Sequence, residues 1–108
     1  MKIERKSSNT LNIYTLFGSH DVIFTAEIDN YVNNNKFILV KLSNNKIIVV
    51  NRKGIKVANF ESKENKKITK IYIDNLEKKN KLCLQIQEGS AFHEYELDEN
   101  NLKLKRML

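Results

Sequence analysis

The chain has 108 residues, of which 41% are hydrophobic, and it carries a formal net charge of +6. These values predict one globular domain with its own core and favour a globular chain over a disordered one. No apolar run approaches the ~20 residues of a membrane span, and the first residues lack an apolar signal-peptide core, so we expect a cytoplasmic protein that does not enter a membrane. The single cysteine, Cys83, excludes an internal disulfide.

The basic charge has two explanations. It fits binding to nucleic acid, to an anionic membrane surface or to an acidic protein. The chain also contains 16 Lys, 15 Asn and 12 Ile residues but no Pro or Trp, which is the composition that an A/T-rich genome produces without selection for charge. We therefore give the charge little weight as an indication of function.

Apolar and polar residues alternate along most of the chain, as in Val22, Phe24 and Ile28, and short polar clusters separate the runs. This pattern is typical of short strands joined by tight turns. The best helical segment, 75–81, is short and lacks an apolar face. Because the connections are too short for parallel crossovers, we expect an all-β antiparallel meander. Its ten predicted strands are 2–6, 11–17, 22–29, 36–42, 46–51, 55–60, 68–74, 81–87, 91–97 and 102–107.

A repeat of about 45 residues is visible. Residues 28–39 and 73–84 share six of twelve residues, and both segments begin with Ile-Asp-Asn. After an insertion of two residues, 55–57 also aligns with 102–104. The repeat predicts that residues 28–60 and 73–107 form equivalent four-stranded meanders. The single domain, 1–108, would then contain a half unit at 1–17, one repeat at about 22–60 and a second at about 68–107.

Four strands in about 45 residues resemble a blade of a β-propeller, as in WD40 and kelch repeats. Residues 37–60, with a tight turn at Asn51–Gly54, are also similar to WG-type repeats. Two and a half blades cannot close a ring of about four to eight. The resemblance therefore implies a partial propeller-like stack, one member of a ring built from several chains, or a barrel or sandwich made from a duplicated meander. We expect the last, because a single chain must cover its own sheet edges.

Strand 36–42 has apolar residues on both faces, with Ile38 and Val40 on one face and Phe37 and Leu39 on the other, so it is predicted to be central. The last strand, which is rich in Lys, is predicted to be an exposed edge. The other predicted core residues are Leu42, Ile48, Val50, Ile71, Ile73, Leu82, Leu84, Ile86, Tyr95, Leu97, Leu102 and Leu104.

Three reactive side chains have structural explanations that we prefer to catalytic ones. His20, followed by Asp21, is assigned to a hairpin turn. His93 would face away from its neighbours Glu94 and Glu96, so we expect a satisfied, partly buried histidine in place of a metal ligand. Cys83 lies in an apolar strand without a partner base and is expected to be a small packing residue.

Asp29 and Asp74 occur in the two Ile-Asp-Asn segments. They could pair as two carboxylates, but we expect each to start a turn through a local side-chain hydrogen bond. The chain has no phosphate-binding loop and none of the common catalytic motifs. We therefore expect a protein that is not an enzyme, with no catalytic residues, metal or cofactor.

A small domain without catalytic motifs is typical of inhibitors and of bacterial immunity proteins and antitoxins, which neutralise a partner protein, such as a toxin, by covering its surface. Loops 30–36 and 75–81 occupy equivalent places in the two repeats, where recognition is expected. We predict Tyr31 as an interface anchor and Lys78, Lys79 and Lys81 as rim charges facing an acidic partner.

Two alternatives stay open. The basic segment Lys63–Lys81, which Glu64 and Glu77 dilute, could bind nucleic acid or another polyanion, with Tyr72 and Tyr31 as the aromatic candidates for base stacking. A subunit of a ring-shaped, propeller-like lectin is suggested by the repeat alone. The sequence does not fix the oligomeric state.

Overall fold

The computed structural model describes residues 1–107, which form eleven strands and one short 3₁₀ turn. The all-β prediction is confirmed. No helix in this part of the chain is long and apolar enough to cross a membrane. The strands are β1 (Lys2–Ser7), β2 (Thr10–Thr15), β3 (Gly18–Ile23), β4 (Ile28–Asn33), β5 (Phe37–Leu42), β6 (Lys46–Asn51), β7 (Lys56–Glu61), β8 (Lys66–Asp74), β9 (Lys81–Glu88), β10 (Ala91–Asp98) and β11 (Lys103–Arg106), with the 3₁₀ turn η1 at Leu76–Lys78.

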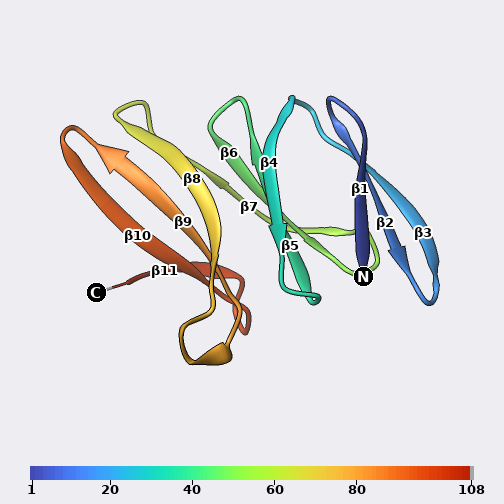
Figure 1. The fold of residues 1–108 in the computed structure, drawn as a ribbon. Helices are drawn as coiled ribbons and strands as arrows, with labels where there is room; N and C mark the ends of the chain where they lie inside the picture. The colour runs from blue at the N-terminus through green and yellow to red at the C-terminus, as the bar shows by residue number, and fades with distance from the viewer. Residues whose placement is uncertain (108) are drawn as a thin grey trace.

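The strands form three open antiparallel sheets, and each sheet is a meander in chain order: β1–β3, β4–β7 and β8–β11. Figure 1 shows the three sheets side by side, with the first strand, β1, and the last strand, β11, in the two outer sheets. The two four-stranded sheets have the same strand order, as the repeat predicted. The barrel that we expected as one form of the duplicated meander is wrong, because residues 1–107 form three open sheets that cover one another's apolar faces and do not close on themselves. This stack of separate meanders is nearer to the partial propeller-like alternative.

The middle sheet is buried on both faces. Ile38 and Val40 of β5 enter a first core, shared with the first sheet, while Leu39 enters a second core, shared with the third sheet. The prediction that β5 has two buried faces is confirmed. The first core contains Leu11, Ile13, Val22, Phe24, Ile28, Ile38, Val40, Leu42 and Val50, and the second contains Leu39, Ile47, Val49, Ile68, Ile71, Leu82, Leu84 and Leu97.

Most of the predicted core residues are buried or packed against the two cores, with two exceptions. Ile73, near the end of β8, is 37% exposed. Leu102 is only half-buried, because it lies in the turn before β11 and not in the strand itself. The prediction that β11 is an exposed edge is confirmed, since among residues 1–107 it pairs with β10 alone.

The stack has two distinct ends. At the crossover end, segments 24–27 and 62–65 lead from one sheet to the next. Each crossover forms a backbone hydrogen bond to a hairpin turn of the sheet that precedes it. The Phe24 N–H donates to the Asn9 oxygen of the β1–β2 turn at 2.8 Å, and the Ser62 N–H donates to the Asn45 oxygen of the β5–β6 turn at 3.3 Å.

The strand that follows each crossover also forms a hydrogen bond to this turn. The Ile28 N–H donates to the Ser8 carbonyl at 2.8 Å, and the Ile68 N–H donates to Asn45 Oδ1 at 2.9 Å. The turns at Asn9 and Asn45 are therefore equivalent, and β1, β2 and β3 correspond to β5, β6 and β7. The first sheet lacks a counterpart of β4 and β8.

The prediction of one strand at 22–29 is wrong, because these residues span the end of β3, a crossover and the start of β4. Val22, Phe24 and Ile28 all enter the first core, so the apolar alternation continues through the crossover and hides the break. The half unit consequently ends at Ile23 instead of residue 17. A two-residue turn at Leu16 and Phe17 adds β3 to the first sheet.

The sequence repeat aligns the two units in the wrong register. Ile28 begins β4 and is followed by a β-bulge, whereas Ile73 lies near the end of β8. The structural counterpart of Ile28 is Ile68, which is also buried and also precedes a bulge. The two four-stranded sheets therefore share their strand order, but the two Ile-Asp-Asn segments lie at different positions within them.

Asp29 and Asp74 are accordingly not equivalent. Asp29 lies in the bulge of β4, with Oδ2 2.7 Å from Lys41 Nζ. Asp74 ends β8, where its Oδ1 accepts a hydrogen bond from the Leu76 N–H at 2.8 Å. The predicted turn-starting role is confirmed for Asp74 and wrong for Asp29, because Asp29 is in a strand.

We expect the two cores to contribute comparably to stability. Replacing Ile38 (first core) or Leu39 (second core) by Ala should each lower the free energy of unfolding by about 2–5 kcal/mol, through lost burial and a cavity. The matched controls are Ile23→Ala and Leu16→Ala, at positions 64% and 101% exposed, which should change it by about 0.5 kcal/mol or less. Urea denaturation measures all four values, and a negligible effect of either core variant would contradict the stacking.

Candidate protein-binding site

The turn between β2 and β3 presents two large apolar side chains to solvent. Leu16 is 101% exposed and Phe17 is 94% exposed. Thr15 Oγ1 accepts a hydrogen bond from the Phe17 N–H at 3.2 Å, and Gly18 adopts φ +127°, a conformation that favours glycine. The turn is thus defined by its flanking residues, and the two apolar side chains are free to contact another molecule.

The neighbouring turn, between β6 and β7, belongs to the middle sheet and is held by Asn51. Its Oδ1 accepts hydrogen bonds from the N–H groups of Lys53 (2.9 Å) and Ile55 (3.0 Å). Gly54 adopts φ +77°, and a Cβ at this position would lie 2.8 Å from the Cβ of His20 on β3. This close approach packs the first sheet against the turn of the middle sheet.

A hollow of about 420 Å³ lies between these turns. The turns are at the end of the stack opposite the crossovers (Figure 1), which we call the hairpin end and which carries the β2–β3, β4–β5, β6–β7 and β8–β9 turns. Arg52 Nε donates a hydrogen bond to the Asn35 carbonyl, so the β4–β5 turn forms part of the wall. The lining includes two cations and no carboxylate, and neither Arg52 nor Lys53 forms an ion pair within residues 1–107. The lining residues are Met1, Thr15, Leu16, Phe17, His20, Asn35, Arg52 and Lys53.

The predicted rim lysines lie at the same end of the stack but beside the third sheet. Lys78 and Lys79 are exposed in the β8–β9 connection. Lys79 Nζ is 3.3 Å from Glu77 Oε2, and Lys81 Nζ is 3.4 Å from Glu96 Oε2. Carboxylates therefore offset two of the three charges, in contrast to the cations of the hollow.

Tyr31 does not lie with these lysines. It belongs to β4, pairs with Val40 and packs half-buried against the first core, so the predicted loop 30–36 is wrong for residues 30–33. The remaining turn does reach the other predicted loop, because Asn34 Nδ2 donates to the Asn80 carbonyl at 3.3 Å. The two connections therefore emerge at corresponding ends of their sheets, as predicted.

Sequence reasoning missed Leu16 and Phe17, because it assigned them to a strand at 11–17. Phe17 keeps the spacing of Leu11 and Ile13, so the alternation of β2 continues into the turn. The signal that could have identified them is Gly18, which directly follows the pair and has a conformational freedom that suits the end of a two-residue hairpin turn.

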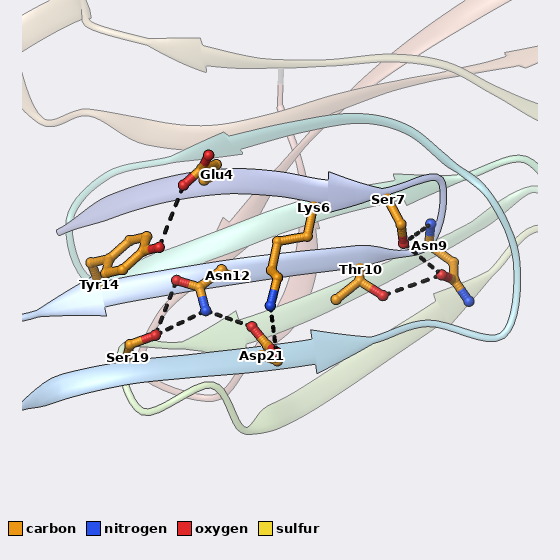
Figure 2. Close-up of polar contacts among 9 residues, drawn as sticks. All are labelled: Glu4, Lys6, Ser7, Asn9, Thr10, Asn12, Tyr14, Ser19 and Asp21. Atoms are coloured by element: carbon orange, nitrogen blue, oxygen red, sulfur yellow. Dashed lines mark hydrogen bonds and ion pairs between the residues drawn. The ribbon is translucent and has the colours of Figure 1, made fainter.

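His20 and Asp21 lie on β3 and not in the predicted turn. Figure 2 shows that Asp21 faces a polar network on the outer face of the first sheet. The hydrogen bond donated by Asn12 and the ion pair with Lys6, 3.0 Å away, lower the pKa of Asp21. Asp21 therefore interacts with Asn12 and Lys6 and does not orient the imidazole of His20.

His93 is partly buried, and its Nδ1 is 2.6 Å from Arg106 Nη2 on the edge strand β11. Glu94 lies on the opposite face, where its carboxylate accepts hydrogen bonds from Tyr72 Oη at 3.0 Å and from Gln85 Nε2 at 3.1 Å. The prediction that His93 and the neighbouring glutamates face apart is confirmed. Within residues 1–107, no three metal-ligating side chains converge.

The aromatic candidate for nucleic-acid stacking, Tyr72, is half-buried in the same network. Burial and its hydrogen bond to Glu94 raise its pKa. Lys70 Nζ also lies 5.2 Å from the centre of its ring. The ring of Tyr72 therefore already has contacts within the chain.

Compared with models of known protein families, with curated proteins and with solved structures, the chain gives no match. The fold defines it as a stack of three antiparallel meanders. Its candidate site is the exposed apolar turn and the basic hollow at the hairpin end.

Cys83 should make stability sensitive to alkaline pH. The side chain is fully buried, and burial raises the pKa of its thiol from 9.0 to about 11. Between these values the folded state keeps a proton that the unfolded chain has lost, so stability falls as the pH rises. From pH 8.5 to 10.5, the wild type should lose about 1–2 kcal/mol more free energy of unfolding than Cys83→Ala. Equal losses in denaturation experiments would contradict this.

Proposed function

We propose that the protein is a small, non-catalytic protein-binding protein of the inhibitor or immunity type, which covers part of an acidic partner with its hairpin end. The observation that carries this proposal is the nearly complete exposure of Leu16 and Phe17 on a defined turn. A partner that buries them gains about 1.5–3 kcal/mol for each side chain. Adjacent exposed apolar side chains of this kind are typical of protein interaction sites.

The charges at the hairpin end support the proposal of an acidic partner. Arg52 and Lys53 line the hollow, Lys36 is exposed in the adjacent β4–β5 turn, and Lys78 extends the rim toward the third sheet, where Glu77 offsets the charge of Lys79. Such cations favour a partner with carboxylates around an apolar pocket, and they should speed its association. A bacterial toxin with an acidic patch is one such partner.

A cytoplasmic location is part of the same proposal. Cys83 is a free and buried thiol, which fits a reducing compartment. Binding by occlusion also needs no reactive group of the protein's own, since covering a partner's surface suffices to block access to it.

The proposal can be tested by site-specific photo-crosslinking. A benzophenone amino acid replaces Phe17 in one variant and Tyr14, which is 40% exposed on the outer face of the first sheet, in the control. The variant with the probe at position 17 should form one light-dependent adduct with an acidic protein that unlabelled wild-type chain competes away. The probe at position 14 should form none. Adducts only at position 14 would contradict the site.

Binding kinetics on the captured partner distinguish the contribution of the apolar turn at Leu16 and Phe17 from that of the surrounding cations. Phe17→Ser should raise the dissociation rate about 10- to 100-fold, because the lost burial is worth about 1.5–3 kcal/mol. Lys53→Glu should mainly slow association and weaken its dependence on salt. If neither variant changes protein binding, and if reversing the lysines of Lys63–Lys81 abolishes RNA or DNA binding with a steep salt dependence, the nucleic-acid alternative replaces this proposal.

A further inference from the structure

The first sheet is one strand shorter than the other two. Its strands β1–β3 correspond to β5–β7, so the position that β4 fills beside β5 is left vacant beside β1 by residues 1–107. Figure 1 shows β1 at the edge of the first sheet. An edge strand presents unpaired N–H and C=O groups that can pair with another extended chain.

Side chains around the vacant position are more exposed than their counterparts. Ile3 of β1 corresponds to Leu39 of β5, because the turns at Asn9 and Asn45 are equivalent; Leu39 is fully buried but Ile3 only half-buried. A residue of the middle sheet that would face the added strand is also more exposed than its counterpart in the third sheet. Tyr31 follows the bulge of β4 as Ile71 follows the bulge of β8. Ile71 is 5% exposed, whereas Tyr31 is only half-buried.

The counterparts also show which side chains a strand at this position would carry. Arg5 corresponds to Lys41, whose Nζ lies 2.7 Å from Asp29 Oδ2 on the adjacent strand β4. In the described part of the chain, Arg5 has no adjacent strand on that side. Its Nε donates to the Ser7 carbonyl at 3.1 Å, and its guanidinium is 3.9 Å from Glu27. A carboxylate on an added strand would meet Arg5 as Asp29 meets Lys41.

The backbone of β1 is oriented for such pairing. In the middle sheet, the Asn34 N–H donates to the Phe37 oxygen at 3.2 Å, so Phe37 directs its backbone groups toward β4. Because successive residues of an antiparallel strand direct their N–H and C=O groups to opposite sides, Leu39 and Lys41 also direct theirs toward β4. The counterparts Ile3 and Arg5 therefore direct their N–H and C=O groups toward the vacant position.

We propose that the free edge of β1 is a strand-acceptor site, which binds an extended acidic peptide segment of a partner protein antiparallel to β1. One face of the added strand carries an apolar residue beside Ile3 that covers Tyr31, and a carboxylate lies next to Arg5. Tyr31 thereby serves as an interface anchor from a strand and not from a loop. This site is separate from the hairpin tip and does not depend on the function proposed above.

A second copy of the chain is a poorer occupant. Antiparallel pairing of two β1 strands would bring the positive side chains of this strand, Lys2, Arg5 and Lys6, near one another against the single carboxylate of Glu4. Like charges directly opposite each other destabilise strand pairing. The charge of β1 therefore selects an acidic strand.

The sequence of β4 supplies a direct probe, because β4 fills this position in the middle sheet. A peptide with blocked ends and the sequence of residues 27–33 is titrated into the isotope-labelled full chain and followed by NMR and amide hydrogen exchange. The N–H groups of Ile3 and Arg5 should gain protection, and the ring signals of Tyr31 should shift. This measurement uses the unsubstituted chain, so it does not depend on the stability of a variant.

Charge reversal supplies the matched control. Arg5→Glu should lower the affinity for this peptide about fivefold to tenfold. A peptide with Lys at the position of Asp29 should show the reverse preference. Phe17→Ser should bind the peptide like the wild type, which separates this site from the hairpin tip. The proposal is overturned if saturating peptide leaves the β1 amides unprotected, if Arg5→Glu keeps the wild-type preference, or if β1 pairs with a second copy instead.

Discussion

The middle sheet is buried on both faces, and the rest of the fold depends on this constraint. Residues that alternate along β5 and β6 belong to different cores, so neither core can form without the same two strands. A sheet with two apolar faces is insoluble by itself and needs a layer on each side. The first and third sheets supply these layers, and the stack therefore behaves as one unit although its sheets share no strand.

The outer faces of the stack have the opposite character. On the first sheet, Asn12, Ser19 and Asp21 form a hydrogen-bonded network, which Figure 2 shows. On the third sheet, Glu94 accepts hydrogen bonds from Tyr72 and Gln85. Polar terminal faces stop further stacking, as in the capping units of repeat proteins. They do not favour a ring of several chains joined through these faces, and they leave the hairpin end and the β1 edge for contacts with other molecules.

Period-two alternation was sufficient to predict most of the strands and the two-faced character of β5, because it reports directly which side chains are buried. It could not show which sheet a strand joins. Phe24 is buried in a crossover, and Phe17 lies in a turn at the spacing of Leu11 and Ile13, so both extended the pattern across real boundaries. The site was missed for the same reason. Tyr31 could be recognised as an unusual aromatic, but its position beside a missing strand appears only when the three sheets are compared.

Native-state hydrogen exchange tests the central claim most directly. If the two cores depend on the middle sheet, the amides of β5 and β6 should exchange only through global unfolding, and the paired amides of β2 and β9 should reach the same free energy of opening. The edge strands β1 and β11 should open at lower cost. The account would be contradicted if β9 and β10 kept their protection under conditions in which β5 and β6 had already exchanged.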